Sequence, residues 1–160
     1  MWWLVSPQNP LKPADGMAPF EDRMAAARHL ADDPRILVSD LEYRLETRYT
    51  ADSLAALIKR YPRAAFVWLM GADNLAQIDQ WKDWTTIFDA LPIAVFDRPT
   101  YSDAALTCPA AQRFASSRMD ESRARDLAGQ TPPAWVFVQG KLHAASATEI
   151  RRNASKNDAN

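Results

Sequence analysis

Short apolar runs alternate along this chain with segments of helical periodicity, and this alternation constrains its fold more than any other feature. The clearest run is 64–70 (AAFVWLM), which is apolar throughout and carries β-branched and aromatic residues near its middle, as strands do. Further strands are predicted at 2–5, 36–38, 93–96 and 135–138. Unbroken apolar runs indicate strands that are buried on both faces, which is typical of parallel sheets. The sequence therefore predicts an α/β fold with a mostly parallel sheet and helices on both faces.

Helical segments lie between these runs. Pro19 suits the start of the first helix, because proline fits a first helical turn and Glu21 follows at the positive end of the dipole. We expect this helix to end at Asp33-Pro34 and to bury Met24, Ala27, Leu30 and Ala31. Thr50 is predicted to be the N-cap of a helix over about 51–61. The remaining helices are expected at about 81–88, 110–118, 121–128 and 146–152.

The composition of the 160 residues fits one domain with its own core and excludes several classes of protein. With 19 basic and 20 acidic residues the formal net charge is −1, which gives no general attraction to nucleic acid or to an anionic membrane. The single cysteine, Cys108, excludes an internal disulfide and fits the reducing cytoplasm. His29 and His143 lack the spacing of a metal site. No apolar run reaches the roughly 18 residues of a membrane-spanning helix, and the first residues do not have the pattern of a secretory signal.

The residues that follow the predicted strands are the first candidates for a site, because parallel α/β folds bind ligands beyond the carboxyl ends of their strands. Gly71 and Asp73 follow the clearest strand. Glycine there lets a ligand approach the backbone, and an acid can accept hydrogen bonds from ribose hydroxyls. Asp73 could equally cap the next helix. Arg98 and Lys12 also follow strands, and each is either an exposed turn residue or a phosphate contact.

A capping box begins at Ser146 (SATEIR), with Glu149 three residues further on. Such a helix start is either purely structural or an anion site, to which Arg151 would add a phosphate-binding guanidinium. Trp81 and Trp84 have helical spacing and indicate either core packing or stacking of one of them on an aromatic ring. The chain has neither a Walker loop nor a dinucleotide-binding fingerprint, so a phosphate site would be built from helix starts and side chains.

Six segments are informative because of their order: WWLVSPQNPLK (2–12), RYTADSL (48–54), WLMGADNL (68–75), the tryptophan pair at 81 and 84, FDRP (96–99) and SATEIR (146–151). Together they resemble the bacterial nicotinate-nucleotide adenylyltransferases, which are nucleotidyltransferases of the HxGH type with a Rossmann-like sheet. The likeness implies a nucleotidyltransferase domain over 1–152, followed by a polar tail over 153–160. It implies transfer of the adenylyl group of ATP to nicotinate mononucleotide, which forms deamido-NAD and pyrophosphate, with Mg²⁺ accompanying ATP.

The resemblance also implies roles for individual residues. Those expected to bind ATP are Gly71, Asp73, Arg98, Ser146, Thr148 and Arg151. Those expected to bind the acceptor are Lys12, Thr50, Ala51 and Trp81. Trp81 would stack on the nicotinate ring, and the helix start at Thr50 would receive the nicotinate carboxylate. The acceptor phosphate is already an anion, so no residue is expected to act as a general base, and none is expected to be a metal ligand.

The family's glycine-rich first turn and its HxGH motif have no match in these residues. In the family they precede the position of Trp2, so we expect them to be encoded upstream of Met1, in a strand-and-helix unit of roughly 30 residues or more. One alternative is a non-catalytic remnant that at most binds a nucleotide. Another is a related nucleotidyltransferase whose acceptor is nicotinamide mononucleotide or pantetheine phosphate.

Overall fold

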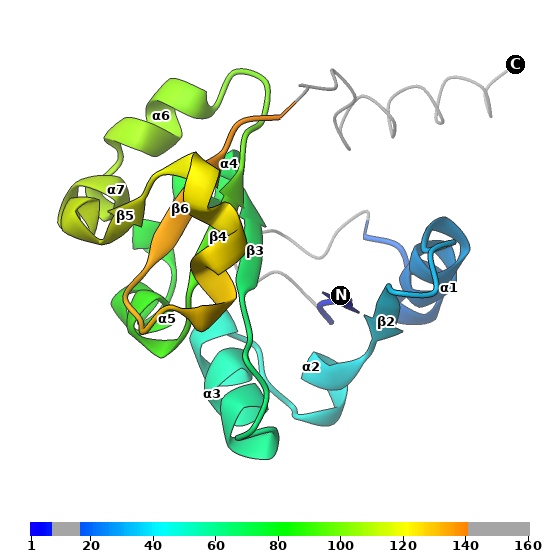
Figure 1. Cartoon of the computed structure of the whole chain (residues 1–160). Coiled ribbons are helices and arrows are strands. Elements are labelled where there is room, and N and C mark those ends of the chain that lie inside the picture. Colours follow the sequence, from blue (N-terminus) through cyan, green and yellow to red (C-terminus); the bar gives the residue numbers. More distant parts are fainter. Residues whose placement is uncertain (8–16, 141–160) are drawn as a thin grey trace, which may run out of the picture. The chain divides into compact units, whose positions relative to one another are not determined.

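The computed structural model describes residues 1–7 and 17–140, which fall into two compact units. The first unit comprises Met1–Phe66 and Trp81–Ala90, and the second comprises Val67–Gln80 and the described residues from Leu91 on. Each unit carries its own parallel sheet (Figure 1). The predicted parallel α/β fold is therefore confirmed, with its strands divided between two sheets. The expected boundary at 152 lies outside the described residues.

The first unit combines a two-stranded sheet with four helices. Its elements are β1 (Trp2–Leu4), α1 (Phe20–Leu30), β2 (Leu37–Ser39), α2 (Leu41–Arg44), α3 (Thr50–Arg60) and α5 (Trp84–Ala90). The two strands run parallel, and α1 packs Met24 and Ala27 against Val5 in a small core. These elements follow the predicted order, apart from α2, which was not predicted. α1 begins at Phe20, one residue after Pro19, which was expected in its first turn.

Two burial predictions for the first unit are wrong. Trp2 and Trp3 are 40% and 39% exposed, because β1 pairs with β2 alone among the described residues. Leu30 is 68% exposed, because it is the last residue of α1 and the buried face of that helix ends earlier, at Ala27.

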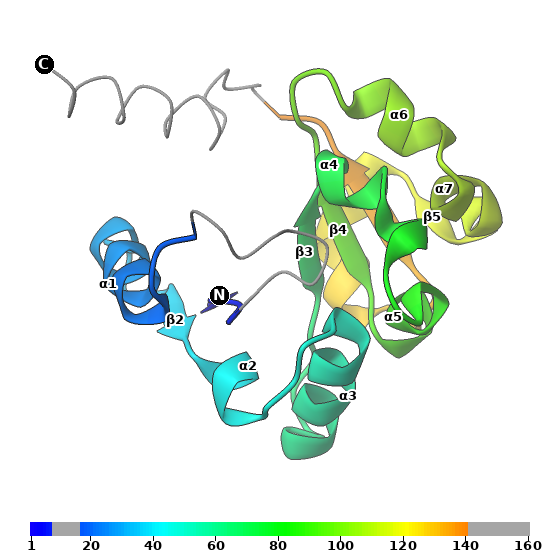
Figure 2. The same ribbon diagram turned by 180° about the vertical axis from the view of Figure 1, so that it is seen from behind.

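The second unit is built on a four-stranded parallel sheet in the order β3-β4-β6-β5. Its elements are β3 (Trp68–Gly71), α4 (Ala72–Leu75), η1 (Ile78–Gln80), β4 (Ile93–Phe96), α6 (Ser102–Thr107), α7 (Pro109–Arg113), η2 (Ala115–Ser117), β5 (Arg118–Met119), η3 (Glu121–Gly129) and β6 (Trp135–Val138). Figures 1 and 2 show η3, the unlabelled yellow helix, on one face of this sheet and α4 on the other.

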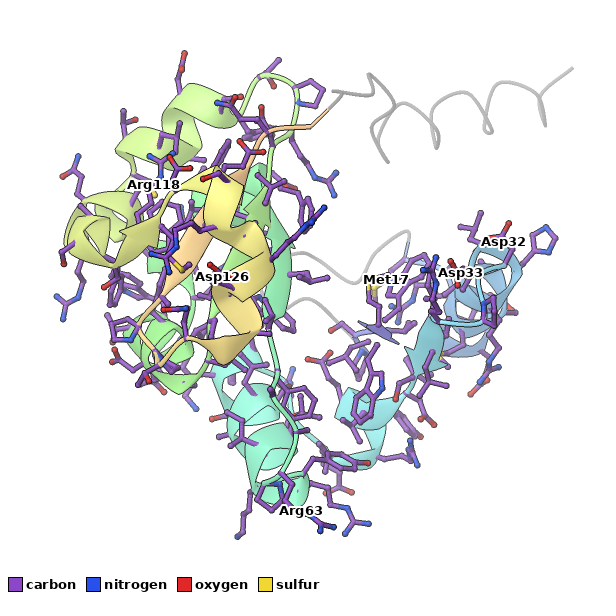
Figure 3. The ribbon with its side chains drawn as sticks, in the orientation of Figure 1. Met17, Asp32, Asp33, Arg63, Arg118 and Asp126 are labelled. Atoms are coloured by element: carbon purple, nitrogen blue, oxygen red, sulfur yellow. The ribbon has the colours of Figure 1, made fainter. Side chains whose placement is uncertain are left out.

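The core of the second unit follows the two-residue alternation of its central strands. On the face toward η3, Ala94 and Val136 pack against Leu127. The neighbouring residue Trp135 is 1% exposed, and its indole N–H donates to the carbonyl of Phe114 at 2.8 Å. Arg118, labelled in Figure 3, lies with its guanidinium 5.4 Å from the centroid of the Trp135 ring.

Some predicted elements of the second unit have other bounds. The strand predicted over 64–70 forms only from Trp68 on, because the Ala64 N–H bonds the Tyr61 carbonyl in a turn after α3. The helix predicted over 110–118 is the shorter α7, which Pro109 starts and Cys108 caps by accepting the Ala111 N–H on its sulfur. The helix predicted over 121–128 is a 3-10 helix, and five elements were not predicted: α4, η1, α6, η2 and β5. Among the described residues, no helix has the length and apolar character needed to cross a membrane.

Candidate functional site

The register of β3 and β4 brings Asp73 and Arg98 together at the carboxyl ends of the two strands. Gly71 is opposite Phe96 in this parallel pair, and both residues end their strands, so Asp73 and Arg98 each lie two residues beyond a strand end. The Arg98 Nε atom lies 3.1 Å from Oδ1 of Asp73. Both side chains reach solvent, at 55% exposure for Arg98 and 32% for Asp73, so a ligand in solution can contact them.

Gly71 leaves the space in which this pair meets. A Cβ atom on Gly71 would lie 2.3 Å from Oδ1 of Asp73 and 2.5 Å from Nε of Arg98, both closer than such atoms ever approach. The Gly71 backbone, at φ −83° and ψ 159°, is extended and suits any residue. The glycine is therefore needed for the close approach of its neighbours and not for its own dihedral angles.

The Asp73 carboxylate keeps an unused acceptor. Its Oδ1 atom is buried and accepts no hydrogen bond in the described structure, since Arg98 meets it at ion-pair distance without hydrogen-bond alignment. A buried acceptor without a donor is costly, and an incoming hydroxyl would remove that cost. This atom has the capacity to accept a hydrogen bond from a ligand, which reaches it once the surrounding side chains move.

Asp97 fixes the backbone that carries Arg98. Its Oδ1 atom accepts the Arg98 N–H at 2.8 Å and the Ser102 hydroxyl at 2.6 Å, and its own N–H bonds the Val138 carbonyl at 3.0 Å. These bonds tie the end of β4 to the start of α6 and to the end of β6. Arg98 thus projects from a fixed turn, although its side chain is exposed.

In the first unit, the start of α3 has no side-chain cap. The helix begins with Thr50 itself, and the N-cap residue is Tyr49, whose side chain makes no capping hydrogen bond. The prediction that Thr50 is the N-cap is therefore wrong by one residue. The first N–H groups of a helix have no partner within it, so this end carries donors and a positive partial charge suited to an anion. Thr50 and Ala51 are both half-buried here.

Lys82 joins the segment of Trp81 to this helix start. Its Nζ atom lies 3.1 Å from Oδ2 of Asp52 in the first turn of α3 and 4.9 Å from the centroid of the Tyr49 ring. The hydrogen bond to Asp52 raises the pKa of Lys82. Desolvation opposes this effect, and the charges of Asp52, Asp83 and Tyr49 each make a smaller contribution in the same direction as the hydrogen bond. Trp81 is half-buried and lies in a bend before α5, so the expectation that it shares a helix with Trp84 is wrong. The positive φ of Asp83, 51°, marks the turn that separates the two tryptophans.

Several predicted site residues lie outside the described residues: Lys12, Ser146, Thr148 and Arg151. The structure brings Gly71, Asp73 and Arg98 together in the second unit, and it links the segment of Trp81 to the helix start at Thr50 in the first. Within 1–7 and 17–140, no group of three His, Cys, Asp or Glu side chains is arranged to hold a metal ion.

Two contributors to these sites were not predicted. Asp97 was seen only as part of the FDRP segment, and its position before Arg98 after a strand is the signal that could have identified it. Lys82 directly follows Trp81, but its partner Asp52 is 30 residues away, so no local pattern reveals the pair.

Comparisons with known proteins show the family to which the chain belongs. The family of cytidylyltransferase-like proteins matches residues 1–153. The probable nicotinate-nucleotide adenylyltransferase of Parvibaculum lavamentivorans is 51% identical over 151 residues, which cover 94% of this chain and 75% of that protein. The protein of the same name from Ruegeria pomeroyi is 50% identical over 152 residues, which cover 94% of this chain and 70% of that one.

Solved structures show the same fold at low identity. Plasmodium falciparum nicotinic acid mononucleotide adenylyltransferase complexed with NaAD matches with a TM-score of 0.64 and 16% identity, over 94% of this chain and 67% of that one. The same enzyme complexed with APC matches with a TM-score of 0.62, over 94% of this chain and 66% of that one. This chain thus spans about two thirds of the length of these structures.

The fold and the family match together define a cytidylyltransferase-like protein. Within that class, the identity of about half over nearly the whole chain shows that it belongs to the nicotinate-nucleotide adenylyltransferase family.

Proposed function

We propose that this protein transfers the adenylyl group of ATP to nicotinate mononucleotide, forming deamido-NAD and pyrophosphate in NAD biosynthesis. The observation that carries the proposal is the cluster of Gly71, Asp73 and Arg98 at the carboxyl ends of β3 and β4, in a chain 51% identical to a protein with that name. Cys108, the one cysteine of the sequence, is buried, and we propose a place in the cytoplasm, where thiols are kept reduced.

ATP would be bound at the cluster in the second unit. The free acceptor on Oδ1 of Asp73 would take a ribose hydroxyl of the adenosine, and Gly71 would let the nucleoside approach the backbone. Arg98 would leave its exposed ion pair with Asp73 to contact a phosphate, for which its forked donors are suited. The remaining phosphate contacts would come from residues outside the described part of the chain, namely Ser146, Thr148 and Arg151.

Nicotinate mononucleotide would be bound in the first unit. The uncapped N–H groups at Thr50 and Ala51 would receive the nicotinate carboxylate, which favours the acid over the amide because only the acid is charged. The pyridine ring would stack on Trp81. The next residue, Lys82, would keep Trp81 near the start of α3 through its hydrogen bond to Asp52. Lys12, outside the described residues, would contact the acceptor phosphate.

The reaction needs positioning more than acid-base groups. An oxygen of the acceptor phosphate attacks the α-phosphorus of ATP in line, the new P–O bond forms, and the bond to the β-phosphate oxygen breaks to release pyrophosphate. The attacking oxygen is already anionic, so no proton has to be removed. Mg²⁺ would enter with ATP and neutralise its phosphate oxygens, which are the hard ligands this ion prefers. Arg98 would neutralise part of the remaining charge.

A comparison of acceptors tests the proposal. Pyrophosphate release from ATP is measured with the native protein in the presence of nicotinate mononucleotide, nicotinamide mononucleotide or pantetheine phosphate. We expect the acid to be the preferred acceptor, and preference for another acceptor would assign a related nucleotidyltransferase activity instead. Calorimetry with deamido-NAD tests the non-catalytic alternative, which predicts heat of binding without any pyrophosphate release.

A further inference from the structure

The first unit buries a carboxylate that none of the roles above uses. Glu42, in α2, is 9% exposed, and Ser53, in the first turn and a half of α3, is 3% exposed. Among the described residues these are the buried polar or charged side chains, and they bond each other, with the Ser53 hydroxyl 2.9 Å from Oε1 of Glu42. Burial of a carboxylate is costly unless hydrogen bonds satisfy it, and the Ser53 hydroxyl supplies one such bond.

The hydrogen bonds in this network have a direction. The Ser53 hydroxyl donates its one proton to Oε1 of Glu42. The Thr47 hydroxyl, 2.8 Å from the Ser53 oxygen, must then donate to Ser53. The Tyr49 carbonyl, 3.2 Å from the same hydroxyl, is a second and longer acceptor. The network therefore runs from Thr47 through Ser53 to Glu42.

Backbone bonds strengthen the same connection. The N–H of Thr47 donates to the carbonyl of Glu42 at 3.2 Å, and the N–H of Ser53 donates to the carbonyl of Tyr49 at 3.0 Å. Glu46, in the turn between Glu42 and Thr47, has a positive φ of 53°, a backbone conformation that is unfavourable for a residue other than glycine. Glu42 thus fixes both ends of the segment 47–53, which contains the start of α3.

The side chains of this network do not cap the first N–H groups of α3. Thr47 lies two residues before the N-cap, Ser53 is the fourth residue of α3, and both hydroxyls are engaged with each other and with Glu42. Tyr49 between them makes no cap. The first N–H groups of α3 consequently keep their donor capacity for a ligand.

We propose that Glu42 is a positioning residue, which acts through Ser53 and Thr47 to hold the start of α3 open for the carboxylate of the acceptor. This inference rests on the proposed function, since it assigns the acceptor to that helix end. Glu42 does not touch the acceptor in this account, and its effect is confined to acceptor binding because the ATP-binding cluster lies in the other unit.

Binding measurements on three variants test the inference. Glu42→Ala removes the network, Glu42→Gln keeps an oxygen that accepts the Ser53 hydroxyl, and Glu21→Ala makes the same change at an exposed position of α1. Calorimetry gives the Kd of each native-length variant for nicotinate mononucleotide and for ATP. We expect Glu42→Ala to raise the Kd for nicotinate mononucleotide about tenfold, the effect of one misplaced buried hydrogen bond, and to leave the Kd for ATP within about twofold. Glu42→Gln and Glu21→Ala should bind both ligands as the unaltered protein does.

The inference is overturned if Glu42→Ala weakens both ligands equally, if it weakens neither, or if Glu42→Gln is as defective as Glu42→Ala. Thr47→Val provides a second variant if Glu42→Ala does not fold. It removes one hydrogen-bond donor from a half-buried position, and we expect it to raise the Kd for nicotinate mononucleotide and to leave the Kd for ATP unchanged. Thr47→Val without any effect on acceptor binding contradicts the inference as well. Absence of nicotinate mononucleotide binding in the unaltered protein would instead overturn the proposed function, and with it the site that Glu42 is said to position.

Discussion

A Cβ atom on Gly71 would lie 2.3 Å from Oδ1 of Asp73, so the identity of one residue is set by the carboxylate of another two positions later. The Gly71 backbone is extended, and its dihedral angles place no demand on the residue type. The same missing side chain leaves room for Nε of Arg98. Gly71 thus belongs to the cluster of Asp73 and Arg98, the proposed ATP site, through the space it leaves.

Gly71→Ala is expected to weaken ATP binding about tenfold or more, because the added methyl displaces both Asp73 and Arg98. Its effect on folding should be small, since the displaced atoms are the ends of partly exposed side chains. The Kd for ATP and the midpoint of thermal unfolding check both expectations. Gly129→Ala is the matched control, because a Cβ there meets no atom within 4 Å. Equal loss of ATP binding in the two variants would contradict the role given to Gly71.

Asp73→Ala and Arg98→Met are expected to separate function from stability. The ion pair they break is partly exposed, so each change should alter the free energy of unfolding by no more than about 1 kcal/mol. Loss of the ribose acceptor and of the phosphate contact should nevertheless lower kcat/KM for ATP by about two orders of magnitude or more. Steady-state kinetics beside denaturant titration measure both quantities. A large loss of stability with unchanged kinetics would show that the pair is structural.

The apolar runs predicted the fold well where burial alone decides the structure. β4 and β6 have the predicted bounds, because Ile93 and Trp135 begin runs that the sheet buries. The pattern failed where hydrogen bonds decide: the turn at Ala64 shortens β3, and the cap at Cys108 starts a new helix. β5 is too short to leave a periodic signal, since it consists of Arg118 and Met119 alone.

The candidate site could be predicted only in part, for similar reasons. Gly71, Asp73 and Arg98 were found because each follows a strand, and the strand register then brings them together. Lys82 and Glu42 were missed because their partners, Asp52 and Ser53, lie in other elements. Contacts between elements appear only once the chain is folded.

Lys82→Met is expected to weaken acceptor binding and to leave ATP binding unchanged, because Lys82 ties the segment of Trp81 to the first turn of α3. The dependence on pH gives a second check. The pKa of Lys82 is raised above its ordinary value of 10.5, chiefly by the hydrogen bond to Asp52. The contribution of charged Lys82 to acceptor binding is therefore complete below pH 10.5, and it is lost as the pH rises through the raised pKa of Lys82 in the folded protein. The difference in acceptor Kd between the two proteins should be constant from pH 7 to 9 and shrink only in strong alkali; a difference that disappears near neutral pH would refute this assignment.

Tyr49→Asp is expected to stabilise the fold and, at the same time, to weaken binding of the acceptor. Aspartate at the N-cap would accept the free N–H groups of α3 and raise the free energy of unfolding by about 0.5–2 kcal/mol. Those donors would then be lost to the nicotinate carboxylate, so the acceptor Kd should rise while the ATP Kd stays constant. Tyr49→Leu removes the same contact with Lys82 without adding a capping group, so it controls for the loss of that contact and should bind the acceptor as the unaltered protein does. A variant that is more stable and binds the acceptor unchanged would place the carboxylate elsewhere.

Trp135→Phe is expected to destabilise the second unit by about 2–4 kcal/mol, since it opens a cavity and leaves the Phe114 carbonyl without its donor. Trp3→Phe, at a position 39% exposed, makes the same chemical change and should cost less than about 1 kcal/mol. Urea unfolding of the two variants measures the difference. Similar losses would show that the indole of Trp135 does not contribute through its buried hydrogen bond.

The structure of the native protein with deamido-NAD bound tests the central claim most directly. We predict an adenosine ribose hydroxyl within hydrogen-bond distance of Oδ1 of Asp73, and the nicotinate carboxylate at the first N–H groups of α3 with its ring against Trp81. A dinucleotide that leaves Asp73 uncontacted, or a nicotinate carboxylate bound away from the start of α3, would contradict the account.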